Sequence, residues 1–137
     1  MCNCVDVTMG SYNNQVMLEY PPHMQDYKEH RIEAGFSDKI CVDACLEKEI
    51  KELWNQGIMT TGCCCGHNKS TPYIGVFQQD IKKMVDMGYI ITVNFAGTHN
   101  IHRMDSFFPK SIKISYVMWR SYFKHADMII KEYCVIE

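Results

Sequence analysis

Long apolar runs are missing from this sequence of 137 residues. The longest uncharged apolar stretch is far shorter than the roughly 20 residues that a membrane-spanning helix needs, so we expect no membrane segment. The opening residues Met-Cys-Asn-Cys-Val-Asp lack a basic segment followed by an apolar one, so no signal peptide is predicted. These two absences predict a soluble protein that stays in the cytoplasm.

The sequence also lacks a large excess of charge of either sign. Fourteen basic and 16 acidic residues give a net charge of −2, which predicts no strong electrostatic attraction to nucleic acid. The chain has no glycine-rich phosphate loop, no His-Glu-x-x-His zinc motif and no deaminase pattern. It also has no internal repeat, low-complexity tract or linker, so residues 1–137 are expected to form one domain, with 112–137 as a C-terminal extension.

The hydrophobic pattern predicts a mixture of strands and helices. Asp43 is suited to begin a helix and Gly57 to end it. Strands are predicted at 16–20, 40–42, 58–62, 73–77 and 89–95, helices at 44–56 and 80–87, an exposed helix or ordered loop at 23–38, and a strand at 112–117 before a helix to about 132. This order predicts a small α/β or α+β domain in which two or three helices pack on one sheet.

Cysteine, by contrast, is abundant, with eight residues in the chain. In a reducing compartment, clustered cysteines bind metal or perform chemistry more often than they form disulfides. Seven of them fall in clusters, the last of which is followed by a histidine, and Cys134 stands alone as a predicted buried thiol. The candidate ligands are Cys2, Cys4, Cys41, Cys45, Cys63, Cys64, Cys65 and His67, enough for one or two zinc ions.

The spacing favours a structural zinc site. Cys64-x-x-His67 lets two side chains reach one ion, and Gly66 between them permits a sharp turn. Cys45 is predicted in the first helical turn, where the helix dipole favours a thiolate. A sulfur-rich ligand set with no general-base motif is more typical of structural than of catalytic zinc.

A cysteine nucleophile or an open zinc site is the alternative. Cys65 or Cys63 could attack a substrate, with His67 as the base and Asp43 orienting it. These are the right residue types, but their spacing does not establish the geometry.

Two further patterns concern ligands in the second half of the chain. The loop after the predicted strand 89–95 could hold a metal or a phosphate, although a solvated loop is favoured; its candidate residues are Asn94, His99, His102, Arg103 and Lys110. Basic and aromatic residues alternate between Phe107 and Lys124, which suits nucleic acid but suits a packed amphipathic segment better.

Several motifs together resemble a known family. They are Met9-Gly10-Ser11-Tyr12, Ile40-Cys41-Val42-Asp43, Tyr73-Ile74-Gly75-Val76, and above all Thr60-Thr61-Gly62-Cys63-Cys64-Cys65-Gly66-His67-Asn68. From Cys2 to about Ser111 the sequence resembles a family of small uncharacterised proteins encoded in bacteriophage and prophage genomes. The resemblance implies a phage origin and action in the host bacterial cytoplasm, and it implies no activity.

The leading hypothesis is a zinc-stabilised binding module of a phage. Its partner would be a host or phage protein or another macromolecule, or a nucleotide signal of host defence that it sequesters. The alternatives are a small zinc- or cysteine-dependent enzyme at Cys63–His67 and a nucleic-acid-binding protein. Self-association is left open.

Overall fold

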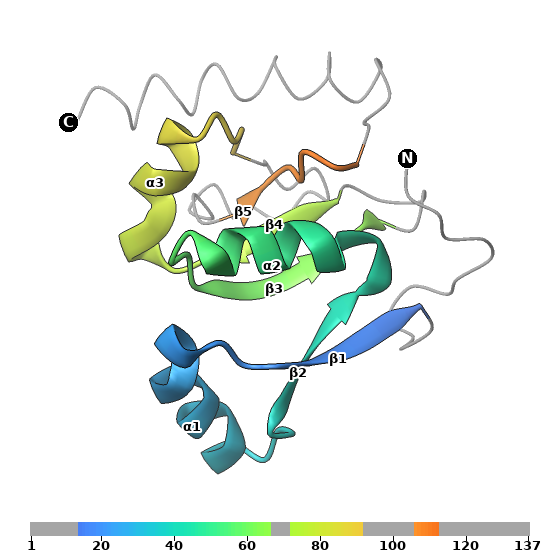
Figure 1. The fold of residues 1–137 in the computed structure, drawn as a ribbon, viewed down its shortest axis with the longest axis vertical. Coiled ribbons are helices and arrows are strands. Elements are labelled where there is room, and N and C mark those ends of the chain that lie inside the picture. Colours follow the sequence, from blue (N-terminus) through green and yellow to red (C-terminus); the bar gives the residue numbers. More distant parts are fainter. Residues whose placement is uncertain (1–13, 67–71, 92–105, 113–137) are drawn as a thin grey trace, which may run out of the picture.

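Two small antiparallel sheets and three helices make up the structure, a computed structural model that describes residues 14–66, 72–91 and 106–112. The helices are α1 (Gln25–Glu33), α2 (Glu47–Asn55) and α3 (Ile81–Asp86). The strands are β1 (Gln15–Glu19), β2 (Lys39–Asp43), β3 (Thr60–Cys64), β4 (Tyr73–Val76) and β5 (Ser106–Phe107). Figure 1 shows α2 at the centre, α1 beside the first sheet and α3 beside the second.

The first sheet is a two-stranded ribbon of β1 and β2. Val16 pairs with Val42, and Leu18 pairs with Ile40, so one face of the ribbon is apolar and turns towards the core. Pro21 follows β1 and cannot continue a strand ladder, and α1 begins shortly afterwards. The opposite face carries Met17, which is 52% exposed.

The second sheet has the order β3-β4-β5. Its middle strand, β4, is nearly all buried and contributes Ile74 and Val76 to the core. Gly75 lies so close to β3 that a Cβ atom there would be 2.3 Å from Thr61 Oγ1. This position therefore requires glycine if the two strands are to keep their spacing.

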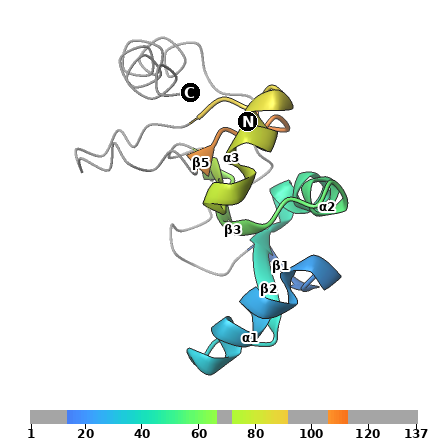
Figure 2. The same cartoon turned by 90° about the vertical axis from the view of Figure 1, so that its left-hand side faces the viewer.

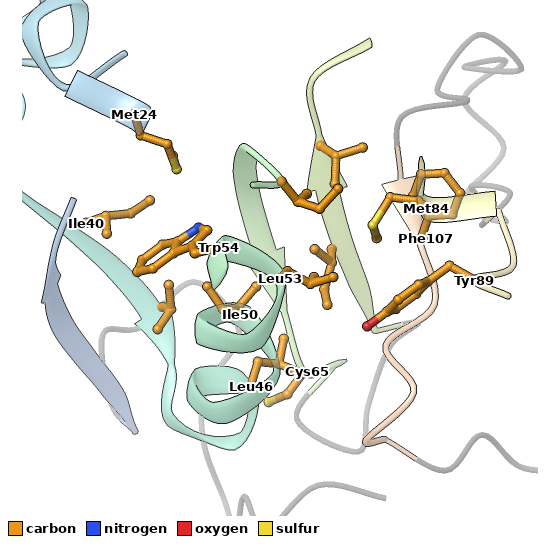
Figure 3. Close-up of a cluster of buried hydrophobic side chains, with 14 of the residues drawn as sticks. Met24, Ile40, Leu46, Ile50, Leu53, Trp54, Cys65, Met84, Tyr89 and Phe107 are labelled. Carbon is orange, nitrogen blue, oxygen red and sulfur yellow. The ribbon is translucent and has the colours of Figure 1, made fainter. Parts of the chain in front are cut away.

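Helix α2 holds the two sheets together. Its apolar side carries Ile50, Leu53 and Trp54, which are all buried. In Figure 3, Trp54 faces Met24 and Ile40 beside the first sheet. Figure 2 shows the same arrangement from the side, with the ribbon and α1 extending away from the second sheet.

Most of the predicted elements are confirmed with small shifts in their ends. Gly57, with a φ of +81°, follows α2 as expected of a residue that ends a helix. The expectation of one sheet is wrong for the described residues, because β1–β2 and β3–β4–β5 form separate sheets. The hydrophobic pattern of the sequence could not distinguish one sheet from two, because alternation along a strand does not reveal which other strand it pairs with.

Two other expectations need correction. Asp43 makes no capping hydrogen bond, and α2 begins only at Glu47, after a 3₁₀ turn at Ala44–Leu46. Of the predicted strand 89–95, Ile91 forms only an isolated bridge to Phe107, and 92–95 lie outside the described residues. The predicted elements after 112 also lie outside them. No helix in the described ranges has the length and apolarity needed to cross a bilayer.

A buried carboxylate joins α2 to the segment after β5. Glu49 is 6% exposed, and its Oε2 accepts hydrogen bonds from the Tyr89 hydroxyl at 2.6 Å and from the Lys110 backbone N–H at 2.8 Å. Its Oε1 accepts from the Ser111 backbone N–H at 3.0 Å and from the Ser111 hydroxyl. These four donors compensate for removing the charged group from water.

We expect Glu49→Gln to lower the free energy of unfolding by about 2–3 kcal/mol, because an amide cannot accept all four hydrogen bonds with charge assistance. Glu52→Gln, on the exposed side of the same helix, is the matched control and should change stability by less than about 0.5 kcal/mol. Urea denaturation followed by circular dichroism measures both. Equal stability of the two variants would contradict the role assigned to Glu49.

Ionisation of Tyr89 should lower the free energy of unfolding at alkaline pH. Burial, and then the hydrogen bond and charge of Glu49, raise the pKa of Tyr89 well above its usual 10.0. Because the folded pKa exceeds the unfolded one, the stabilisation is complete below about pH 10 and is lost as pH rises beyond it. Free energies of unfolding measured across this range should fall by up to about 1.4 kcal/mol more per pH unit in the wild type than in Tyr89→Phe. Parallel curves would refute this coupling.

Candidate metal centre

The described cysteines lie around the junction between the two sheets. Cys41 is in β2, Cys63 and Cys64 are the last two residues of β3, and Cys65 follows directly. Cys45 lies in the 3₁₀ turn before α2 rather than in the first turn of the helix, where it was expected. Among the described residues, no disulfide joins any two of these five cysteines. The predicted ligands Cys2, Cys4 and His67 lie outside the described residues.

Asp43 organises this junction. It is 1% exposed, and its Oδ2 accepts a hydrogen bond from the Cys65 backbone N–H at 2.7 Å. Its Oδ1 accepts from Gln15 Nε2 at 3.1 Å. The carboxylate thus ties the end of β2 both to β1 and to the end of β3, which is why it does not cap the following turn.

The Cys63 thiol lies in this junction and resists ionisation. Burial is the main reason that its pKa is raised from 9.0 to about 12. A hydrogen bond with the Asp43 backbone lowers this pKa, while the charges of Asp43, Cys64 and Cys41 raise it further. Without a bound cation the thiol therefore stays protonated at neutral pH, unlike the low-pKa thiols of catalytic cysteines.

The other partly buried thiols also have polar contacts. The Cys41 thiol donates to Gln15 Oε1 at 2.8 Å, and its pKa is raised by burial and by the charge of Asp43. Cys64 Sγ accepts from the Gly66 backbone N–H at 3.3 Å. Cys45 Sγ accepts from Asn14 Nδ2 at 3.5 Å. The Cys41 and Cys45 contacts thus reach β1 and the residue before it, whereas the Cys64 contact is local.

Cys65 belongs to the hydrophobic core. It is 2% exposed, and Figure 3 shows it beside Leu46. A sulfur in this position cannot meet a substrate from solvent. The geometry therefore disfavours the nucleophile hypothesis for Cys65, and the two hydrogen bonds of Asp43 leave that carboxylate committed to positioning strands.

The predicted zinc ligands lie partly inside and partly outside the described residues. Within residues 14–66, 72–91 and 106–112, no three His, Cys, Asp or Glu side chains come together in a group that could hold a metal ion. A closed zinc site has four ligands, and the predicted candidates Cys2, Cys4 and His67 lie outside these ranges.

Lys110 is the one predicted ligand-binding residue of its group that the structure describes. Its ammonium group donates to the Met87 carbonyl and lies 4.5 Å from the centroid of the Tyr89 ring. Lys110 thus packs against the Glu49 cluster, which disfavours the predicted phosphate contact. The remaining residues of that group, Asn94, His99, His102 and Arg103, lie outside the described ranges, as does Lys124.

A pocket that the sequence analysis did not single out lies on the other side of the ribbon. It has a volume of about 540 Å³ and is lined by β1, β2 and the end of α1, including Arg31, Phe36 and Lys39. The sequence offered one signal for this pocket wall, which is Gly35 in the polar stretch 23–38. A glycine after a helix favours a tight turn at the helix end.

Comparisons with protein-family models, curated proteins and solved structures gave no match to this chain. The phage origin therefore stays a prediction.

Cys65 gives a direct test of this description. We expect Cys65→Ser to lower the free energy of unfolding by about 1–3 kcal/mol, because it buries a hydroxyl group in an apolar core. Cys65→Ala, which adds no polar group, should cost less. Chemical denaturation gives both values, and mass spectrometry under native conditions gives the metal content. Loss of a bound metal from both variants would instead identify Cys65 as a ligand.

Proposed function

We propose that this chain is a small binding protein whose fold is stabilised by a structural zinc ion, and that it acts as an accessory protein of a phage in the host cytoplasm. Its partner would be a host or phage macromolecule, or a nucleotide signal that it sequesters. The zinc ligands would come from the end of β3 together with Cys2, Cys4 and His67.

The observation that carries the proposal is the placement of the candidate catalytic groups. Cys65 is in the core, and the Asp43 carboxylate is fully buried and holds strands together. Groups built into the core in this way serve stability rather than contact with a substrate. This favours binding over nucleophilic catalysis.

The Cys63 thiol supports the metal part of the proposal. Burial keeps its pKa near 12, so it gains a stable thiolate only if a cation binds beside it. Zinc would supply that positive charge, and its binding energy would then become folding energy. Cys64, the next residue of β3, acts on the Cys63 thiol more strongly than Cys41 does and is the second thiol that we propose as a ligand.

The test is the metal content of the untagged protein, measured by native mass spectrometry before and after denaturation. One or two zinc ions per chain should be released on unfolding, and a chelator should lower the melting temperature. Protein without metal, with freely reactive thiols, would overturn the zinc site.

Paired cysteine variants sharpen this test. Of the ligand set proposed above, Cys2→Ser with Cys4→Ser leaves Cys63 and Cys64 at the end of β3 and His67, one fewer than the four ligands of a closed site. We expect this double variant to lose zinc and to melt at a lower temperature. Cys134→Ser, at the isolated cysteine, is the control and should retain zinc. Full zinc content in the double variant would contradict the proposed ligand set.

A further inference from the structure

The end of helix α1 forms one wall of the pocket described above. The Gly35 N–H donates to the Ile32 carbonyl, and the Phe36 N–H donates to the Arg31 carbonyl, both at 2.9 Å. Together with the φ of +91° at Gly35, these bonds form the double hydrogen-bond pattern of a Schellman motif. This motif brings Phe36 back against the last turn of the helix.

That turn places a cation over an aromatic ring. Arg31 Cζ lies 3.7 Å from the centroid of the Phe36 ring and 5.9 Å from that of Tyr27. Stacking holds the planar guanidinium in one orientation, which reduces the entropy lost when it binds an anion. Phe36 itself remains 53% exposed, so it still offers apolar surface.

Arg31 also has unused hydrogen-bonding capacity. Its Nε is buried and has no hydrogen-bond partner. A buried N–H without an acceptor costs free energy, and a guanidinium edge takes up carboxylate or phosphate through two parallel hydrogen bonds. Because Nε is buried, an anion in the pocket would bind the terminal amino groups of this guanidinium, since Arg31 lines the pocket.

The ribbon supplies the other wall. Met17 contributes an exposed thioether, Lys39 contributes a second cation, and Cys41 and Gln15 contribute the polar part. Lys39 also pairs with Glu19, which reduces its own share in anion binding. None of the lining residues is acidic, so the pocket favours a negative ligand.

We propose that this pocket binds a small organic anion that carries an aromatic ring, of about the size of a mononucleotide. Arg31 would bind the phosphate or carboxylate group, and Phe36 and Met17 would contact the ring. The volume of about 540 Å³ falls in the range of small-molecule sites. The proposal rests on the proposed binding function, to which it adds a ligand class and a location away from the Cys65 end of β3.

Three probes separate the two parts of the ligand. Adenosine monophosphate has both ring and anion, adenosine has only the ring, and inorganic phosphate has only the anion. In nuclear magnetic resonance titrations of the full chain, adenosine monophosphate should shift the backbone signals of residues 15–17 and 31–41 and bind at least tenfold more tightly than either of the others. Absence of these shifts at millimolar concentrations would overturn the proposal.

Arg31→Gln should weaken binding of adenosine monophosphate by about tenfold or more, the loss expected from a charged hydrogen-bonding partner. Phe36→Ala should weaken it about fivefold through lost ring contact. Lys28→Gln removes a charge from the same helix outside the pocket and is the control, with an affinity within twofold of wild type. Equal affinities for Arg31→Gln and Lys28→Gln would overturn the anion site.

Metal analysis of the same samples separates this proposal from the previous one. Binding by a zinc-free chain would refute the zinc site and leave the pocket supported. A folded, zinc-containing chain that does not bind adenosine monophosphate would refute the proposed anion site and leave the zinc proposal intact. If the pocket signals shift only on addition of a protein or nucleic acid partner, the small-anion proposal is wrong and the surface serves a macromolecule.

Discussion

Burial of one side of helix α2 between two separate sheets is the constraint on which the structure depends. Within the described residues the two sheets share no strand ladder, and side chains of α2 pack between them. Leu53 and Trp54 are adjacent on the helix, yet Figure 3 shows Trp54 turned towards Ile40 of the first sheet and Leu53 towards the side of the second. A further bond holds the same region in place, from Trp54 Nε1 to Thr60 Oγ1 at 2.8 Å.

Two buried carboxylates complete this arrangement where apolar packing cannot. Asp43 joins β2 to the end of β3, and Glu49 joins α2 to the segment at Lys110 and Ser111. Each accepts backbone N–H groups that would otherwise be buried without a partner. Acidic residues in a core usually suggest a catalytic site, but here saturated hydrogen bonding points to a structural role.

The candidate sites occupy different parts of this framework. Cys63, Cys64 and Cys65 lie at or just after the end of β3, whereas the Arg31 pocket, which Cys41 also lines, lies between the ribbon and the end of α1. A metal bound at the end of β3 would stabilise the region where the two described sheets meet. The pocket would remain open to solvent because Phe36 and Met17 project from a ribbon and a turn that extend away from the core.

The sequence by itself determined most of the elements, since period-two and helical patterns, Pro21 and Gly57 act locally. It also identified the cysteines as the unusual chemical feature. Tertiary structure alone decided that the strands form two sheets, that Cys65 faces the core, and that Asp43 bonds to Cys65 instead of capping a helix. It also decided that Arg31 meets Lys39 across a pocket. These outcomes depend on which distant segments meet, and spacing along the chain does not encode that directly.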